Sequence, residues 1–318
     1  MYNAEIKSKF IKEYTTSISM RKLCETTFNA FEAKEREWNA DLCTRRAEDL
    51  MPIMEKLTGI RAASKNPIIT VLHGYVRWCI RNNIPNVCDE ILHSSFSNNS
   101  NLKHQTVRNP LHLQLCLNAA FKPESEKTID NIFRCFYWLA YGGVAEENIL
   151  KIKRSDVDFE NMVVRYDGED FPIYTEAIPA FKNCVELNSF RYIHPGYPDK
   201  LIYKDRISGD ELVRGFSSYS IYTLRAKLSQ RIKEGQTKTD DTSIKISYYR
   251  VWISGLFYRM YERELAGIPV DFYSTALKFT EGKVYKLSKG RNKPQAYVRR
   301  VARAYLNDYR RWKMTLSM

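Results

Sequence analysis

Apolar residues recur at helical spacing through most of the first 92 residues. The clearest case is residues 68–80, where apolar side chains at i, i+3, i+4 and i+7 predict one buried helical face. Ser64 as a cap and Pro67 in the first turn indicate where this helix begins, and Pro85 cannot continue it. Further helices are expected over residues 6–14, 19–31 and 49–57. The pattern predicts a compact bundle of four short helices.

The pattern changes after this bundle. Residues 94–101 are polar and rich in turn formers, which is typical of a linker. An apolar helix is then expected over 128–141 and a hairpin over 163–174, where Asp167-Gly168 supplies the turn, and helical periodicity returns from Ser218. The predicted domains are a helical domain at 1–93, a linker at 94–106 and a second domain at 107–318. The predicted fold class is mainly α with a small β-hairpin sheet (α+β).

Composition narrows the class of partner. Fifty Lys and Arg against 37 Asp and Glu leave a formal charge of +13, which suits a polyanion, although basic surfaces also serve solubility. Seven cysteines without a C-x-x-C pair indicate reduced thiols, and the five histidines show no zinc-binding spacing, so no metal or cofactor is expected. No run of 18 apolar residues and no apolar leader occur. A cytoplasmic protein without a membrane partner is expected.

Two segments carry a recognisable motif. Residues 140–159 have the sequence AYGGVAEENILKIKRSDVDF, and residues 247–257 have SYYRVWISGLF, followed by LAGIP at 265–269. The first resembles the Tyr-x-Gly-Leu-Arg, Glu-Leu and Lys-x-Ser-Asp-Ile-Asp run of tyrosine recombinases (phage integrases). The second resembles their His-x-x-Arg helix. The resemblance implies a two-domain clamp around DNA, formed by a core-binding domain and a catalytic domain.

The resemblance also implies that the catalytic residues are mostly missing. Ala145 occupies the position of a catalytic arginine, Asn148 that of a glutamate and Ser247 that of a histidine, whereas Arg250 is retained. Tyr297 lies at about the distance expected of the nucleophile, with Tyr285 and Tyr305 as rivals. The family's hairpin lysine and its Leu-Gly-His segment have no clear equivalent.

No catalytic residue is therefore expected, and we predict that recombinase activity is lost. A recombinase needs cations on the transferred phosphate and an acid for the leaving group. The alternative is that the motif aligns differently and Lys151 or Arg154 supplies the cation.

DNA binding is the activity that the remaining residues favour, with double-stranded DNA as the partner. Helix starts and the basic C-terminal segment provide groups for phosphates and base edges, although Ser64 and Asn66 could equally serve as helix caps. The predicted DNA-binding residues are Arg21, Lys22, Arg61, Ser64, Lys65, Asn66, Lys245, Arg250, Lys286, Lys289, Arg291, Lys293, Arg299 and Arg300. Self-association through a C-terminal helix is predicted for Tyr305, Leu306, Tyr309 and Trp312.

A recombinase frame without its catalytic set is similar to the lysogeny repressors of SPβ-type temperate phages. The resemblance implies a prophage transcriptional repressor in a bacterial cytoplasm, associated with the nucleoid and open to control by a protein regulator. Fold alone does not fix function. Two alternatives remain: a divergent or accessory site-specific recombinase, and an architectural protein of DNA replication or partition.

Overall fold

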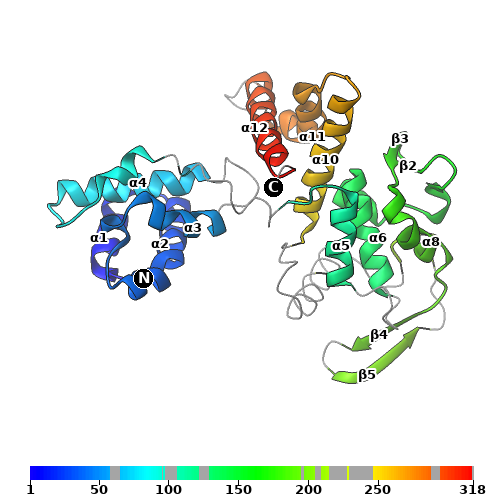
Figure 1. Cartoon of the computed structure of the whole chain (residues 1–318), viewed down its shortest axis with the longest axis horizontal. Coiled ribbons are helices and arrows are strands. Elements are labelled where there is room, and N and C mark those ends of the chain that lie inside the picture. The colour runs from blue at the N-terminus through cyan, green and yellow to red at the C-terminus, as the bar shows by residue number, and fades with distance from the viewer. Residues whose placement is uncertain are drawn as a thin grey trace. The chain divides into compact units, whose positions relative to one another are not determined.

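The computed structural model describes residues 1–57, 65–94, 96, 106–121, 129–194, 197–204, 209–214, 228, 246–287 and 294–316 (Figure 1). The chain divides into two compact units. One unit comprises Met1–Leu102 with Asp271–Arg311, and the other comprises Lys103–Val270 with Trp312–Met318. The C-terminal helical segment is thus divided between the two units, whereas the sequence placed residues 107–318 in one domain; that domain assignment stays a prediction.

The described part of the N-terminal segment forms the helical bundle that the sequence predicts. Its α-helices are α1 (Ala4–Tyr14), α2 (Ile18–Trp38), α3 (Ala47–Leu57) and α4 (Lys65–Arg81), with short 3-10 turns η1 (Leu42–Thr44) and η3 (Asp89–His93). Ser17 caps α2 by accepting from the backbone N–H of Met20, and Asn39 ends that helix in the left-handed region at φ 49°. Helix α2 extends seven residues beyond the predicted end at Phe31. The prediction stopped early because the last turns show no apolar periodicity. The ion pairs Lys34–Glu37 and Arg36–Glu32 support these turns.

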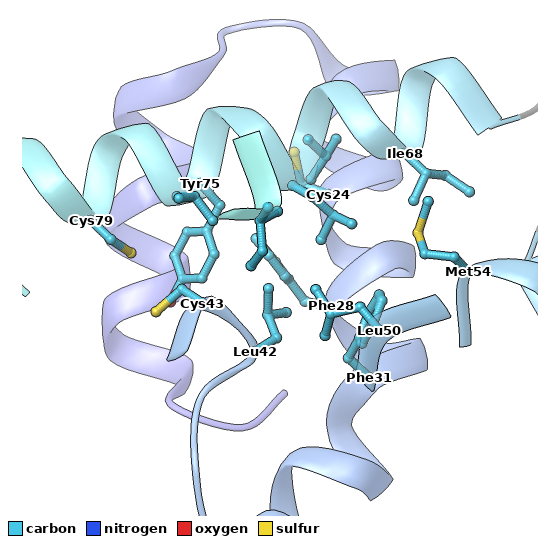
Figure 2. Close-up of a cluster of buried hydrophobic side chains, with 14 of the residues drawn as sticks. Cys24, Phe28, Phe31, Leu42, Cys43, Leu50, Met54, Ile68, Tyr75 and Cys79 are labelled. Carbon is cyan, nitrogen blue, oxygen red and sulfur yellow. The ribbon is translucent and has the colours of Figure 1, made fainter. Parts of the chain in front are cut away.

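The bundle core is aromatic and sulfur-rich. Figure 2 shows Phe28, Tyr75, Cys43 and Cys79 pointing into the space between the helices, where all four are fully buried. The rings of Phe28 and Tyr75 pack edge to face with centroids 5.0 Å apart. All seven cysteines of the chain are free thiols.

A charged group lies inside this core. Lys7 is fully buried, and its Nζ donates to Glu35 Oε2 at 2.6 Å and lies 3.7 Å from Asp41 Oδ2. Tyr75 Oη donates to the same Asp41 oxygen, and the backbone N–H of Leu42 donates to Glu35. Burial raises the pKa of Glu35, and Lys7 acts against that rise. The network fastens α1, α2, η1 and α4 together.

The second unit contains the predicted apolar helix and hairpin. Its elements before the motif helix are α5 (Pro110–Ala120), α6 (Ile129–Gly142), α7 (Glu146–Ile149), η5 (Arg154–Asp156), β1 (Val157–Asp158), β2 (Val163–Tyr166), β3 (Glu169–Pro172), η6 (Thr175–Ala177), α8 (Ile178–Glu186), β4 (Phe190–His194) and β5 (Tyr197–Lys204). Strands β1, β2 and β3 form an antiparallel sheet in that order. Asp167 and Gly168 turn the hairpin with φ values of 54° and 75°, as predicted.

Strands β4 and β5 form a second antiparallel sheet that the sequence analysis missed, and helices α5 and α8 were not predicted either. The remaining helices are α10 (Tyr248–Leu265), α11 (Phe272–Leu287) and α12 (Pro294–Met314). The predicted return of helices from Ser218 lies partly outside the described residues. The fold class, mainly α with a small β-hairpin sheet, is confirmed.

The buried ion pair gives a prediction about stability. Replacing Lys7 with Met should cost about 3–5 kcal/mol of unfolding free energy, because two carboxylates would remain buried without a counter-charge. The matched control is Lys34→Met, which breaks an exposed pair with Glu37 and should cost at most about 1 kcal/mol. Urea unfolding followed by circular dichroism measures both. Equal losses for the two variants would contradict a structural role for the buried pair.

Candidate nucleic-acid interface

The two motif segments meet where α10 crosses α6. Helix α6 ends at Gly142, and Gly143 follows with φ 112°, a conformation that favours glycine. On α10, a Cβ built on Gly255 would lie 2.0 Å from the carbonyl oxygen of Tyr141. The helix backbones therefore touch at this point, and only glycine fits there.

Three further α10 side chains bind the end of α6 and the turn that follows it. Tyr248 Oη donates to the Val144 carbonyl at 2.8 Å, and Trp252 Nε1 donates to the Gly143 carbonyl at 3.3 Å. Arg259 donates to the Tyr141 carbonyl. With Gly255, these residues are spaced at i, i+4, i+7 and i+11, so they lie on one face of α10. The sequence analysis did not identify them as site-building residues, although this spacing was visible in it.

The position of the family's first arginine holds no cation. Ala145 is half-buried and precedes α7 as its N-cap residue, without a side-chain hydrogen bond. Asn148 accepts from Lys151 Nζ at 3.2 Å. Arg154 is paired with Asp210 at 3.2 Å. Lys151 and Arg154, the alternative cations, thus both have partners within the chain, and whether either reaches a phosphate stays a prediction.

The second motif begins at a helix cap. Ser247 Oγ accepts from the backbone N–H of Arg250 at 3.4 Å, so serine caps α10 at the position where the family has histidine. The Arg250 side chain is half-buried, and burial lowers its pKa. A guanidinium keeps its charge at neutral pH even so. Arg250 therefore remains a cation in the first turn of α10.

The β2–β3 hairpin carries more acidic than basic side chains, which does not favour contact with DNA. Arg165 is the cation nearest its turn, and it pairs with Asp158 at 2.8 Å and more loosely with Asp170 at 3.6 Å. Hydrogen bonds from Asn161 lower the pKa of Asp158, and Arg165 lowers it further. The hairpin therefore carries net negative charge, which a duplex would repel.

Helix α12 separates an apolar face from a basic one. Val298, Ala302, Tyr305, Tyr309 and Trp312 recur at i, i+4 and i+7 spacing and are buried. Exposed side chains on the rest of the helix are Arg299, Arg300, Arg303 and Arg310. Tyr297, half-buried near the helix start, lies beneath the Arg300 guanidinium, 5.2 Å from its ring centroid.

The predicted oligomerisation residues on α12 are engaged within the chain. Trp312 is fully buried, and its Nε1 donates to the Val107 carbonyl at 3.0 Å. Tyr305 and Tyr309 are 4% exposed, and Leu306 is half-buried. These side chains offer little surface to a second protomer while α12 keeps these contacts. Self-association through them stays a prediction, and it would require α12 to move.

In the N-terminal bundle the described residues that were predicted to bind DNA are on the surface. Arg21 and Lys22 are exposed near the start of α2, and Arg21 Nε donates to the Thr15 carbonyl at 3.2 Å. Asn66 is exposed in the first turn of α4. Of the other predicted residues, Arg61, Ser64, Lys245, Lys289, Arg291 and Lys293, and the side chains of Lys65 and Lys286, lie outside what the structure describes.

The exposed face of α4 was only partly predicted. Asn66, Thr70, His73, Arg77 and Arg81 follow one another at i+3 or i+4 along its whole length, with no acidic residue anywhere in the helix. The sequence shows this polar stripe once the apolar positions are removed. Within the described residues, no group of three metal-binding side chains lies together, and no helix is long and apolar enough to span a membrane.

The comparison with protein families supports a recombinase-related N-terminal domain. Residues 1–81 match a family model described as the N-terminal core-binding domain of MrpR, a domain found in tyrosine recombinase and integrase-like proteins. The match covers α1, α2, α3 and α4 of the bundle. A comparison with curated proteins found no match.

The helix crossing gives a second prediction. Replacing Gly255 with Ala should cost about 1–3 kcal/mol of unfolding free energy, because the new methyl group must push α10 away from the Tyr141 carbonyl. Arg263→Ala, on an exposed position of the same helix, is the control and should change stability little. Thermal unfolding of both variants tests this. A Gly255→Ala protein as stable as the control would show that the two helices can separate without cost.

Proposed function

We propose that this protein is a sequence-specific double-stranded-DNA-binding protein on a tyrosine-recombinase frame that no longer cleaves DNA. We propose further that it acts as a transcriptional repressor that maintains lysogeny of a prophage. One observation carries the proposal. Tyr248 and Trp252 of α10 hold the turn after α6 by hydrogen bonds, as a recombinase-like arrangement of the two motif segments requires. The residue next to that turn, where the motif would have an arginine, is the uncharged Ala145.

The chemistry explains why this residue matters. Attack of a tyrosine on a phosphodiester places negative charge on the non-bridging oxygens, which positioned cations must neutralise. Removing one such donor costs on the order of 10²–10³ in rate. Here the first arginine is replaced by Ala145 and the histidine by Ser247, which has become a helix cap.

Binding makes weaker demands than cleavage. It requires phosphate-contacting cations and a few side chains that reach base edges, with no need to align a nucleophile. The chain has a formal charge of +13, and exposed arginines lie on α12 and α2. Asn66, exposed at the start of α4, carries an amide of the type that pairs with adenine. The match of residues 1–81 to a core-binding domain supports the same activity.

The first functional prediction concerns affinity. The full-length protein should bind a specific duplex site more tightly as salt falls, since each phosphate contact releases counterions. Gel-shift titrations on a site selected from random DNA measure this. Asn66→Ala should relax the sequence preference at particular positions, at about 1–3 kcal/mol per lost base contact. Arg299→Ala with Arg300→Ala should weaken all sequences alike.

Two outcomes would count against this prediction. A flat response to salt, or failure to select any site, would reject specific DNA binding. A change of sequence preference caused by the Arg299 and Arg300 variants, with none from Asn66→Ala, would place base recognition on α12 instead of α4.

The second functional prediction concerns cleavage. No covalent tyrosyl-DNA adduct should form on nicked suicide substrates that carry the selected site, and Tyr297→Phe should repress a reporter promoter as well as the unmodified protein. Denaturing gels detect the adduct. An adduct that disappears in the Tyr297→Phe protein would show an active recombinase and refute the proposed loss of chemistry.

A further inference from the structure

A hollow of about 730 Å³ lies beside the C-terminal half of α4. Tyr14, the last residue of α1, and Leu92 of η3 line it together with α4 residues that include His73, Arg77 and Ile80. All of these elements belong to the N-terminal bundle (Figure 1). No described residue of the Ala145 turn or of α12 is among those that line it.

One wall of the hollow depends on a glycine. A Cβ on Gly74 would lie 2.7 Å from the Tyr14 ring, so the absence of a side chain lets the ring lie directly against α4. Tyr14 Oη then donates to the Thr70 carbonyl at 3.4 Å. The ring is thereby fixed beside the exposed face of α4 and does not cover it.

The lining combines cations with apolar surface. Arg77 and Arg81 are exposed, and no Asp or Glu is among the described residues that line the hollow. Between them Ile80 is 45% exposed, which is high for a large apolar side chain on a packed helix. Leu92 is half-buried. The surface therefore offers two anion contacts around an apolar centre.

His73 contributes an uncharged ring to the lining. Burial lowers the pKa of His73 below its ordinary value, so the imidazole is neutral at pH 7. Its Nε2 is buried and is therefore not accessible to a ligand in the hollow. The contacts that the hollow offers come from its arginines and its apolar side chains.

The shape favours a narrow ligand over a duplex. Helices that bind in the major groove protrude into it, whereas this part of α4 is recessed between Tyr14 and Leu92. A phosphate backbone could pair with Arg77 and Arg81 but would leave Ile80 facing charge and water. An extended or helical protein segment can carry carboxylates and apolar side chains together, so it can satisfy both the arginines and the apolar surface.

We infer that this hollow binds a protein segment that carries acidic and apolar side chains, with carboxylates on Arg77 and Arg81 and an apolar side chain over Ile80 and Leu92. The inference concerns protein binding and does not depend on the proposed DNA binding. It assigns to α4 two separate uses along its length, because Asn66 lies in its first turn and the hollow lies in its second half.

Selection from a random phage-displayed peptide library on the full-length protein tests the inference. Enriched peptides should combine Asp or Glu with Leu, Ile or Phe. A synthetic copy should bind the Arg77→Ala, Arg81→Ala double variant on the order of tenfold or more weakly, as measured by fluorescence anisotropy. Arg46→Ala, an exposed cation of the same bundle outside the hollow, should bind it unchanged.

A charge-reversal variant distinguishes a loss of the peptide contact from a general loss of folding. The Arg77→Glu, Arg81→Glu protein should prefer a copy of the peptide in which lysine replaces each acidic residue. Enrichment of no peptide, enrichment of peptides without acidic residues, or binding unaffected by the double variant would each overturn the inference. So would a double variant that loses specific DNA affinity, since the hollow would then belong to the DNA interface; loss of DNA binding by Asn66→Ala alone would leave the inference standing.

Discussion

The second unit depends on the contact between the backbones of α6 and α10. At Gly255 the two helices approach so closely that no side chain fits, and the carbonyl of Tyr141 lies directly against α10. Helix α10 packs along α6 more extensively than any other described pair of helices. Because the separation is fixed there, Tyr248 and Trp252 reach the carbonyls of the turn after α6. The two motif segments are held together by this one crossing.

In the second unit, arginine side chains bind the carbonyls at the ends of three helices, and the end of α6 is one of them. A helix leaves its last carbonyls without partners inside the helix, and these carry partial negative charge. Arg259 donates to Tyr141 at the end of α6, Arg134 to Phe121 at the end of α5, and Arg214 to Leu187 at the end of α8. Burial lowers the pKa of each of the three arginines.

This use of arginine changes how the basic composition is interpreted. A guanidinium has five N–H donors and stays charged, so several backbone carbonyls together can accept its hydrogen bonds. A carboxylate partner would do the same but would add a second buried charge. Three of the 50 Lys and Arg residues thus serve helix ends inside the second unit, and Lys7 serves the core of the N-terminal bundle. Such cations are not available to a polyanion, and the buried acids Glu35, Asp41, Asp130, Glu146 and Asp308 offset them in the net charge. The formal charge of +13 therefore does not by itself locate a DNA-binding surface, and the exposed cations on each element must be considered one by one.

The sequence predicted what depends on periodicity and turn chemistry. The four bundle helices, the Asp167-Gly168 hairpin and helix α6 followed from apolar spacing and from residues that favour positive φ. Helix α5 was missed because its exposed face carries Leu111 and Leu115, which obscures the helical pattern. Strands β4 and β5 were missed since a short isolated pair gives little signal.

The sequence predicted some of the residues that belong to the site, but it did not predict how they contact one another. The motif located Ala145 and Arg250, whereas the role of Gly255 depends on a carbonyl more than a hundred residues away in the chain, which no local pattern reports. The same limit applies to Trp312, which was predicted to take part in self-association and which donates to the Val107 carbonyl within the chain. Long-range pairs between a side chain and a distant backbone group leave no periodic trace in a sequence.

The contacts that hold the helix crossing do not involve the positions that the motif resemblance assigns to catalysis. The crossing is held by backbone carbonyls, a glycine and side chains on the inner face of α10. Ala145 precedes α7 without a side-chain hydrogen bond, and the Ser247 side chain caps α10. A change of side chain at position 145 or 247 would therefore leave the crossing intact, so the geometry of the two motif segments and any chemistry at these positions can vary independently.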